Sequence, residues 1–403
     1  MERRVLVCAT QQHSLAAVLA YRLKADGVRV AAIAPHSPTI GAIKLDVRVH
    51  YQLGRFGRTL ADTVRSFTPD LLIPCDDLAA YALHEMHRQW SQETTPECQQ
   101  LVRLIEKSLG DSKYYPTMRS KIELLRLATE LDISVPVTIV VPSAGDVASA
   151  LKQTLLPAMI KADQSFGGLG VRKVRTPDEA TTGLTAFTKP SSLTAALKDC
   201  VREGRLLPYQ LRRRFHAPRV SVQACIAGRP ANRAVVCENG KVIAGVTVKV
   251  LETMEENGPA TVIETIAHEQ ISRDVKLLVA ALGISGFVGF DFMLDSNERA
   301  WLLELNPRVT PACCLFAPGA SSLGRALRGW LDGDVAVLDD PPAGQRIVMF
   351  PQEIQRDRTS PLLDGPDHHV PWQAPELVLA CLRSALQPSL YDRVARFLKP
   401  AVR

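Results

Sequence analysis

The chain has 403 residues, which is too long for one ordinary hydrophobic core and predicts two or three domains of roughly 100–200 residues each. Apolar residues make up 46% of the chain and charged residues 22%, which excludes a largely disordered protein. The net charge of +6 is mildly basic. It fits a protein that meets anionic ligands such as nucleotides, but it is too weak to indicate nucleic acid.

The sequence predicts neither a membrane span nor a secretion signal. The longest apolar runs, such as 277–282, fall far short of the ~18–20 residues that cross a bilayer. The apolar stretch 5–9 near the N-terminus is shorter than the ~7–15 residues of a secretory signal. Nine cysteines without a C-x-x-C pair indicate neither a disulfide framework nor a zinc site. We therefore expect a cytoplasmic protein with no membrane or nucleic-acid partner.

The N-terminal region reads as strands alternating with helices. Apolar runs predict three strands, at 4–9, 28–34 and 70–75. Helices are expected between them, at 14–24 and 57–67. This alternation indicates a parallel, doubly wound sheet, whose ligands gather beyond the carboxyl ends of the strands. His13, Asp76 and Asp77 lie there and are candidate contacts for a substrate. A helix-start residue without a ligand is an equal alternative for His13, and a cap of the next helix is the alternative for Asp76. No G-x-G-x-x-G follows a strand, which disfavours a dehydrogenase.

The middle of the chain predicts a second unit with a glycine loop. An amphipathic helix is expected at 118–131, and apolar strands at 138–141 and 157–161. The glycine-rich stretch 165–170 follows. Its backbone N–H groups could approach phosphates closely, because glycine leaves the backbone uncovered. A helix-rich return is predicted over 176–211.

A third, antiparallel unit is expected next. Residues 220–226 alternate between apolar and polar, and 228–230 predict a turn. Asn239-Gly240 is a strong hairpin signal. A helical stripe over 271–282 precedes a second hairpin at 287–305. After Pro342 the chain is Pro-rich and predicts loops, with one helix at 376–386.

The second hairpin carries the most informative residues. Its two apolar strands flank a polar turn centred between Asn297 and Glu298, which sets Asp291 opposite Glu304. The period of two then places Asn306 on the same face. Carboxylates opposite each other repel at a Cβ separation of ~5 Å, so a cation should lie between them. A hard divalent ion such as Mg²⁺ fits two carboxylates and an amide oxygen. An ordinary solvated sheet face is the alternative.

Two lysines precede this hairpin. Lys121 opens a helix and Lys161 ends an apolar strand, so either could neutralise phosphate oxygens. A lone lysine is usually solvated, and a glycine cluster alone is usually a flexible turn. Their order along the chain, followed by the carboxylate hairpin, is much more specific than any one part.

With these motifs the sequence resembles the ATP-grasp superfamily of carboxylate–amine ligases. It is most similar to the branch with biotin carboxylase, the large chain of carbamoyl-phosphate synthetase and D-alanine–D-alanine ligase-like enzymes. The resemblance covers roughly residues 1–335 and implies an α/β fold: a Rossmann-like pre-grasp domain, then α+β lid and central domains that hold ATP between them. The implied domains are 1–112 (pre-grasp), 113–211 (lid), 212–335 (central, with the metal site) and a C-terminal extension of unknown role at 336–403.

The resemblance also assigns site residues. The implied nucleotide contacts are Lys121, Lys161, Ser165, Gly167, Gly168, Gly170, Tyr209 and Gln210. Asp291, Glu304 and Asn306 resemble the magnesium ligands, with Mn²⁺ as an alternative ion, and Arg308 and Lys161 resemble the catalytic cations. The stretch 208–214 departs from the family because the acidic residue past the hinge is absent, which leaves nucleotide choice open.

The implied reaction is ATP-dependent activation of a small-molecule carboxylate as an acyl-phosphate, followed by capture by an amine. A carboxylase or a small-molecule kinase with the same nucleotide site is an alternative, as is a non-catalytic ATP-binding regulatory protein. A homodimer is also open. Arg233 and Lys249 are strand residues that could face the cleft, and 310–314 is expected to shape the substrate pocket.

Overall fold

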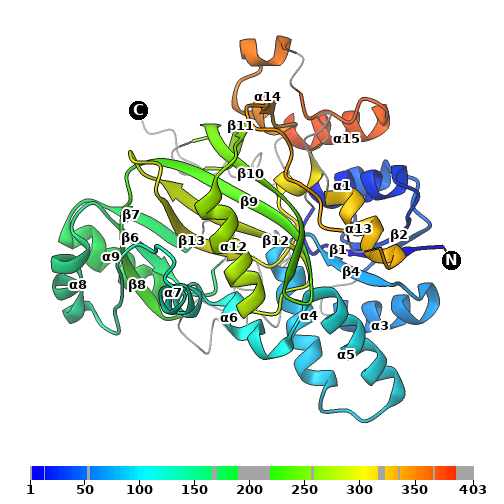
Figure 1. Ribbon diagram of the computed structural model, residues 1–403, viewed down its shortest axis with the longest axis horizontal. Coiled ribbons are helices and arrows are strands. Elements are labelled where there is room, and N and C mark those ends of the chain that lie inside the picture. Colours follow the sequence, from blue (N-terminus) through cyan, green and yellow to red (C-terminus); the bar gives the residue numbers. More distant parts are fainter. Residues whose placement is uncertain are drawn as a thin grey trace, which may run out of the picture.

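The computed structural model describes residues 2–12, 14–51, 55–165, 170–188, 218–255, 258–315, 323–334, 336–365 and 368–386. These residues form three sheets: a four-stranded N-terminal sheet, a small four-stranded sheet and a six-stranded central sheet. Figure 1 shows the N-terminal sheet on the right, the small sheet on the left and the central sheet between them. The mixed α/β class expected from the sequence is confirmed.

The N-terminal sheet is parallel, as predicted, with the order β3-β2-β1-β4. Its strands are β1 Arg4–Cys8, β2 Arg29–Ala34, β3 Val47–His50 and β4 Leu71–Pro74. The helices that cover it are α1 Ser14–Ala25, α2 Pro38–Gly41, α3 Phe56–Phe67, α4 Asp77–Trp90 and α5 Pro96–Leu109. Val5 and Val7 point into one core and Leu6 and Cys8 into another, so both faces of this sheet are covered, as a doubly wound fold requires.

The small sheet has the order β5-β8-β6-β7. Its strands are β5 Thr138–Val140, β6 Ala158–Ala162, β7 Val171–Val174 and β8 Val220–Ala224, and its helices are η2 Ala144–Asp146, α8 Val147–Thr154 and α9 Pro177–Thr188. The sequence placed strand 220–226 in the third unit, which is wrong, because β8 pairs with β5 and β6. Alternation predicts a strand but not its neighbours.

One helix predicted at 118–131 is two. After η1 Ser112–Tyr114 come α6 Tyr115–Arg119 and α7 Lys121–Glu130. Ser120 between them is extended, and its side chain accepts a hydrogen bond from the backbone N–H of Glu123. Such a cap starts a new helix. Lys121 therefore opens α7, as expected.

The central sheet has the order β13-β12-β9-β10-β11-β14. Its first five strands along the chain are β9 Arg229–Glu238, β10 Lys241–Thr253, β11 Ala260–Thr265, β12 Gly286–Leu294 and β13 Ala300–Asn306, with α12 Glu269–Ala281 on one face. Asn239 and Gly240 both have positive φ, which confirms the tight hairpin between β9 and β10. The turn predicted at 228–230 is wrong, since β9 already begins at Arg229.

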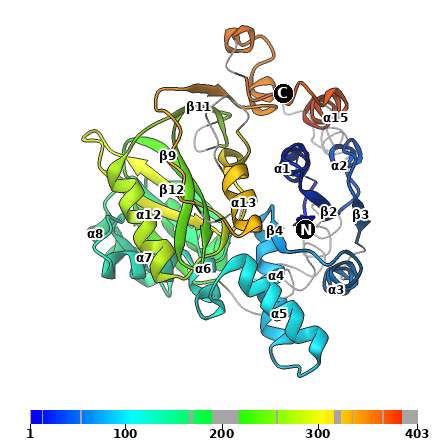
Figure 2. The same cartoon turned by 45° about the vertical axis from the view of Figure 1, so that its right-hand side comes forward.

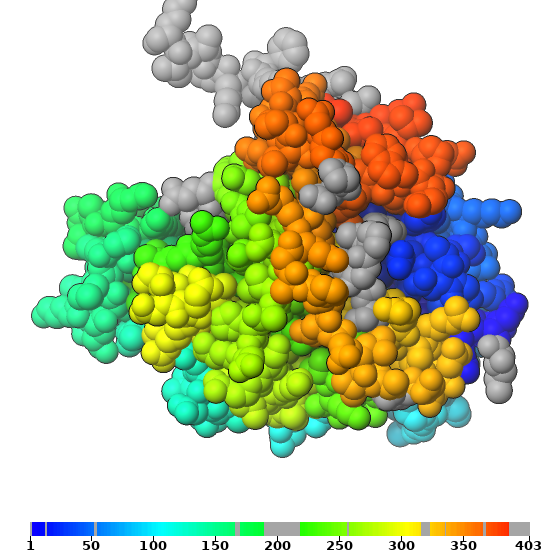
Figure 3. All heavy atoms as spheres, turned by 45° about the horizontal axis from the view of Figure 1, so that its top comes forward, coloured from blue at the N-terminus to red at the C-terminus, as the bar shows by residue number. Residues whose placement is uncertain are grey.

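The C-terminal segment packs against both the N-terminal sheet and the central sheet. Its elements are η3 Pro311–Cys314, α13 Leu323–Asp332, β14 Arg346–Val348, α14 Gln352–Arg356, η4 Pro361–Asp364 and α15 Pro375–Leu386. The helix expected at 376–386 is confirmed, but the stretch after Pro342 also adds β14 to the central sheet beside β11. α13 lies between the N-terminal and central sheets (Figure 2). Figure 3 shows the orange residues of this segment lying along the central-sheet surface.

Candidate active site

The two carboxylates of the second hairpin are opposite each other. Asp291 on β12 pairs in register with Glu304 on β13, which confirms the predicted pairing. The turn is centred on Asn297, because Leu294 pairs with Ala300. A β-bulge follows Asp291 and restores the register that the sequence counted. Bulges of this kind re-aim side chains next to functional sites.

Asp291 is held by two amides. Its Oδ1 accepts from Asn232 Nδ2 at 2.7 Å and its Oδ2 from Asn306 Nδ2 at 2.8 Å. Burial and the nearby Glu304 raise the pKa of Asp291 above its ordinary value. Amide hydrogen bonds favour its charged form but do not reverse this shift. The carboxylate is therefore half-buried and has no bonded cation among the described residues.

Lys121 joins Glu304 to the start of the glycine loop. Its Nζ lies 3.0 Å from Glu304 Oε1 and donates to the backbone oxygen of Ser165 at 2.7 Å. Ser165 in turn donates to the Ala162 oxygen at 2.7 Å. A Cβ on Gly170 would lie 2.2 Å from Ser165 Oγ, so glycine is required where the loop returns to β7. The ends of this loop thus lie beside the carboxylates.

Lys161 lies on β6 with only 8% of its surface exposed. Burial, together with the charge of Lys121, lowers the pKa of Lys161 to about 8, although Glu304 and Asp291 act in the opposite direction. A buried ammonium of this kind gains from a nearby anion. Both predicted lysines therefore sense the same carboxylates, one from α7 and one from the small sheet.

Arg308 is fixed by the N-terminal sheet. Its Nε and Nη2 donate to the two carboxylate oxygens of Asp77 at 2.9 and 3.1 Å. Nη2 also donates to Asn306 Oδ1 at 3.2 Å. Although burial opposes it, the charge of Asp77 raises the pKa of Arg308. Asp77 at the start of α4 thus reaches the site through a bidentate pair, a geometry well suited to arginine.

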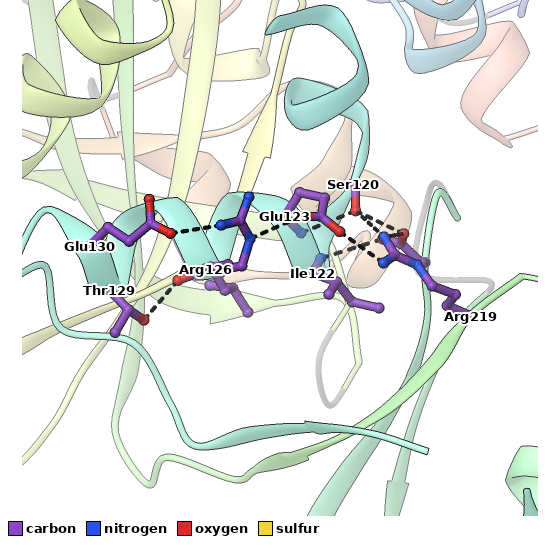
Figure 4. Close-up of polar contacts among 9 residues, drawn as sticks. Ser120, Ile122, Glu123, Arg126, Thr129, Glu130 and Arg219 are labelled. Atoms are coloured by element: carbon purple, nitrogen blue, oxygen red, sulfur yellow. Dashed lines mark hydrogen bonds and ion pairs between the residues drawn. The ribbon is translucent and has the colours of Figure 1, made fainter. Parts of the chain in front are cut away.

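A second polar cluster, which we call the clamp, joins α7 to the small sheet. It consists of Ser120, Glu123, Asp163 and Arg219. Asp163 accepts from Ser120 Oγ at 2.8 Å and from Arg219 Nη2 at 3.1 Å. Arg219 Nη1 also reaches Glu123 at 2.8 Å (Figure 4). Since Ser120 precedes Lys121 and Asp163 follows Lys161 by two residues, the clamp sets the spacing of the two lysines.

A cavity opens beside these groups. It is lined by Lys121, Ser165 and Glu304 from the site and by residues of α4 and α6. The α4 and α6 residues include Asp77, Tyr81 and Arg119. The Arg119 guanidinium lies 5.0 Å from the Tyr81 ring centroid and pairs with Glu85 at 2.8 Å. An anion in this cavity would meet two cationic side chains.

Several expected site residues are placed elsewhere or lie outside the described residues. His13, Gly167, Gly168, Tyr209 and Gln210 belong to the part of the chain that the structure does not describe.

Arg233 does not face the carboxylates. It pairs in register with Phe290, the neighbour of Asp291, and so points to the opposite face. It is buried there on Asp340. Lys249 pairs with Glu264 at 2.7 Å, on the face that Arg233 shares. Both are therefore structural ion pairs, which the strand pattern alone could not separate from site residues.

Asp76 behaves as a cap rather than as an exposed contact. It accepts from the backbone N–H of Ala79 at 2.8 Å and from the Thr10 hydroxyl at 2.6 Å, and it is buried. Of residues 310–314, Ala312, Cys313 and Cys314 pack into the core shared with the N-terminal sheet. This stretch fixes the backbone directly after Arg308; its predicted contact with substrate stays a prediction.

The donor set fits a hard divalent cation. Among the described residues, no three His, Cys, Asp or Glu side chains are grouped so as to hold a metal ion. Mg²⁺, however, usually needs only one or two carboxylates, with substrate phosphates and water completing its shell. Asp291 and Glu304 supply that pair, opposite each other on neighbouring strands. The described residues also include no helix that is both long and apolar enough to cross a membrane.

The chain is similar to known proteins in part of its sequence and in its fold. Residues 121–315 match the family described as the carbamoyl-phosphate synthase L chain, ATP binding domain. No curated protein sequence matches the chain. Several solved structures share its fold at low sequence identity.

One such structure is the biotin carboxylase domain of 2-oxoglutarate carboxylase from Hydrogenobacter thermophilus, with a TM-score of 0.61, 13% identity, and coverage of 86% of this chain and 73% of that one. Another is N5-carboxyaminoimidazole synthase from Aspergillus clavatus, with a TM-score of 0.59, 16% identity, and coverage of 84% and 80%. L-amino acid ligase from Bacillus licheniformis gives a TM-score of 0.53, 15% identity, and coverage of 83% and 76%. The chain therefore has the ATP-grasp fold, and its residues 121–315 match an ATP-binding domain of that superfamily.

Proposed function

We propose that this protein is an ATP-dependent ligase, which activates a small-molecule carboxylate as an acyl-phosphate, joins it to an amine and releases ADP and phosphate. The observation that carries the proposal is the pairing of Asp291 with Glu304 beside Lys121 and Lys161. Two carboxylates opposite each other, with two lysines beside them, could bind a polyphosphate together with its metal ion.

The chain's own residues suggest how the reaction would be supported. Asp291 and Glu304 would hold Mg²⁺, or Mn²⁺ in its place, and the ion would offset charge on the phosphates. Lys121 and Lys161 would bind phosphate oxygens from two sides. Because Asp77 fixes the Arg308 guanidinium, Arg308 would present a preorganised positive charge to the acyl-phosphate or the intermediate that follows it.

The first test is binding. Thermal unfolding with and without millimolar Mg·ATP should show a clear rise in Tm with the nucleotide, since a ligand that binds only the folded state stabilises it. No rise in Tm would contradict the proposal.

The second test is turnover. The protein is screened for ADP release with Mg·ATP and pairs of carboxylates and amines, and active mixtures are analysed by mass. A mass equal to carboxylate plus amine minus water supports ligation. A carboxylated acceptor that forms only when bicarbonate is the carboxylate would indicate a carboxylase, and a phosphorylated product would indicate a kinase. ATP binding without any ADP release across the screen would favour the regulatory alternative.

Glu304→Gln should abolish ADP release while the fold is kept, because the metal pair loses one charge. Glu130→Gln is the matched control, since Glu130 lies on α7 in a surface pair with Arg126. Unchanged turnover in Glu304→Gln would remove the metal assignment.

A further inference from the structure

Arg119 and Lys121 flank the break between two helices. Arg119 ends α6 and Lys121 begins α7, and the residue between them, Ser120, is extended. Side chains on either side of one extended residue point in the same direction. Both accordingly line the cavity beside Glu304, and only 11% and 10% of their side-chain surfaces are exposed. Lys121 contacts Glu304 directly, whereas the proposed reaction gives Arg119 no role.

One edge of the Arg119 guanidinium has no partner among the described residues. Nη1 donates to Glu85 Oε1 at 2.8 Å, and Cζ lies over the Tyr81 ring, 5.0 Å from its centroid. Nε is buried without a hydrogen-bond partner in the part of the chain that the structure describes, which is unfavourable until a ligand accepts from it. Nε and Nη2 together form the edge that binds a carboxylate with two parallel hydrogen bonds. Arg308 uses this edge for Asp77.

The charges around Arg119 favour one more anion. Glu85 divides its two oxygens between two arginines, because Oε1 accepts from Arg119 and Oε2 from Arg88 Nε at 3.1 Å. Arg88 is 61% exposed, so water solvates its charge, whereas Arg119 is mostly buried. The carboxylates that line the cavity are each paired with a cation of their own: Asp77 with Arg308, and Glu304 with Lys121. Two guanidiniums on one carboxylate leave a positive charge that a bound anion would balance.

The size of the cavity favours a carboxylate. The cavity measures about 20 Å³, which is more than the ~10–15 Å³ that one water needs. That is room for one small head group, so the rest of a substrate would lie outside. A carboxylate is flat and short, and its two oxygens match the two parallel donors of Arg119.

We propose that Arg119 binds a second, non-reacting carboxylate of a substrate through its Nε and Nη2. The inference rests on the proposed function, because it takes Glu304 and Arg308 as the place of the reacting carboxylate. Asp77 lines the cavity and holds Arg308, so both arginines lie at this cavity, Arg119 in its wall and Arg308 directly behind it. The substrate is then either a dicarboxylate that is activated at one end or an amino acid that supplies the amine. Both offer Arg119 the same chemistry.

The test compares acids with their amides by isothermal titration calorimetry on the full chain with Mg·ADP. One series contains the dicarboxylates from malonate to adipate and their monoamides. The other contains the common amino acids and their C-terminal amides. An amide keeps the shape of the acid and removes the charge, so at least one acid should bind about tenfold or more tightly than its amide. The series in which this happens identifies the source of the carboxylate. If no acid is preferred over its amide, the inference is wrong.

Substitutions separate substrate binding from helix packing. Arg119→Gln should abolish the preference for the acid, and Arg119→Lys should restore it only in part, because lysine keeps the charge but not the paired donors. The preference is a ratio measured on one variant, so partial unfolding does not change it. Arg88→Gln is the matched control, since it removes the other arginine of Glu85 and should keep the wild-type preference. An unchanged preference in Arg119→Gln would make Arg119 a packing contact between α6 and α4 and overturn the inference.

The inference and the proposed function fail in different ways. If monocarboxylates and simple amines give a ligation product, and Arg119→Gln forms it as the wild type does, the function stands and the role of Arg119 is wrong. If Arg119→Gln weakens Mg·ADP binding but keeps the preference for the acid, Arg119 contacts the nucleotide instead, and the inference is again overturned. If the wild type binds no Mg·ATP, the proposed function itself is refuted, and the inference with it.

Discussion

Asp163 in the clamp is buried and Asp291 beside Glu304 is half-buried, and the charges around these two acidic residues differ. Asp163 accepts from the Ser120 hydroxyl and from the Arg219 guanidinium. Asp291 accepts from two neutral amides and lies opposite Glu304. In the clamp the chain supplies the countercharge itself, which holds two elements together. Opposite Asp291, Glu304 pairs with Lys121, but Asp291 has no bonded cation among the described residues, so a bound cation would supply the charge that Asp291 lacks, as is typical of a binding site.

Of the substitutions that test this difference between the two aspartates, the one at Asp291 should have the largest effect, and that effect is on turnover. Asp291→Asn should lower ADP release at least about a hundredfold, because the metal loses a charged ligand. The same variant should unfold at higher denaturant concentration at pH 7 without metal, because the ionised carboxylate is disfavoured by burial and by Glu304. The measurements are ADP release and urea unfolding monitored by circular dichroism.

The pH dependence gives the sign of this stability effect. Because the pKa of Asp291 is raised on folding, its favourable contribution is present below the unfolded pKa and is lost as pH rises through the folded value. The gain of Asp291→Asn over the wild type should therefore be largest above the folded pKa of Asp291 and shrink as the pH is lowered through it. A variant less stable than the wild type at pH 7 would show that the chain already supplies the countercharge.

The same change at Asp163 should have the opposite sign. Asp163→Asn weakens the pair with Arg219, which is half exposed, so we expect a loss of about 1 kcal/mol in the free energy of unfolding. Because the clamp spaces Lys121 and Lys161, KM for Mg·ATP should rise about tenfold with a smaller change in kcat.

Glu123→Gln is the matched control, since it also removes a partner of Arg219 (Figure 4) but leaves the Ser120–Asp163 bond in place. It should lose stability without the rise in KM. Equal effects of the two variants on KM would reduce the clamp to a structural contact.

The sequence could predict the residues of the site that lie close together in the chain. Asp291 and Glu304 belong to one hairpin, so counting from the turn was enough to pair them. The count placed the turn half a residue away from its position, and the bulge after Asp291 compensated. The sequence also indicated that Lys121 opens a helix, but it predicted one helix over 118–131, and the Ser120 cap that begins α7 at Lys121 was identified only in the structure.

The rest depends on pairings between distant segments. Asn232 reaches Asp291 only because β9 lies beside β12, 59 residues apart at this pair, and nothing near Asn232 in the sequence marks it. The Asp77–Arg308 pair spans 231 residues. The short strand β14 was missed for the same reason: three residues in a Pro-rich stretch become a strand only because β11 offers an edge.

The smallest expected effect is the pH dependence of nucleotide binding, which tests the role of Lys161 beside the carboxylates. The pKa of Lys161 is lowered to about 8 by burial and by Lys121, so in the free protein Lys161 loses its proton as the pH rises through about 8. Phosphate groups nearby would favour the charged form, and binding would then take up a proton. Affinity for Mg·ADP should fall about fivefold between pH 8 and pH 9, as the protonated fraction does.

Calorimetry in buffers of different ionisation enthalpy measures this proton uptake. Lys161→Arg should bind Mg·ADP with an affinity that is flat from pH 7 to pH 9, because arginine stays charged throughout. If the wild type is equally flat and takes up no proton, Lys161 does not meet the phosphates. In that case only Lys121, of the two lysines, would contribute positive charge beside Asp291 and Glu304 when the nucleotide and its metal bind.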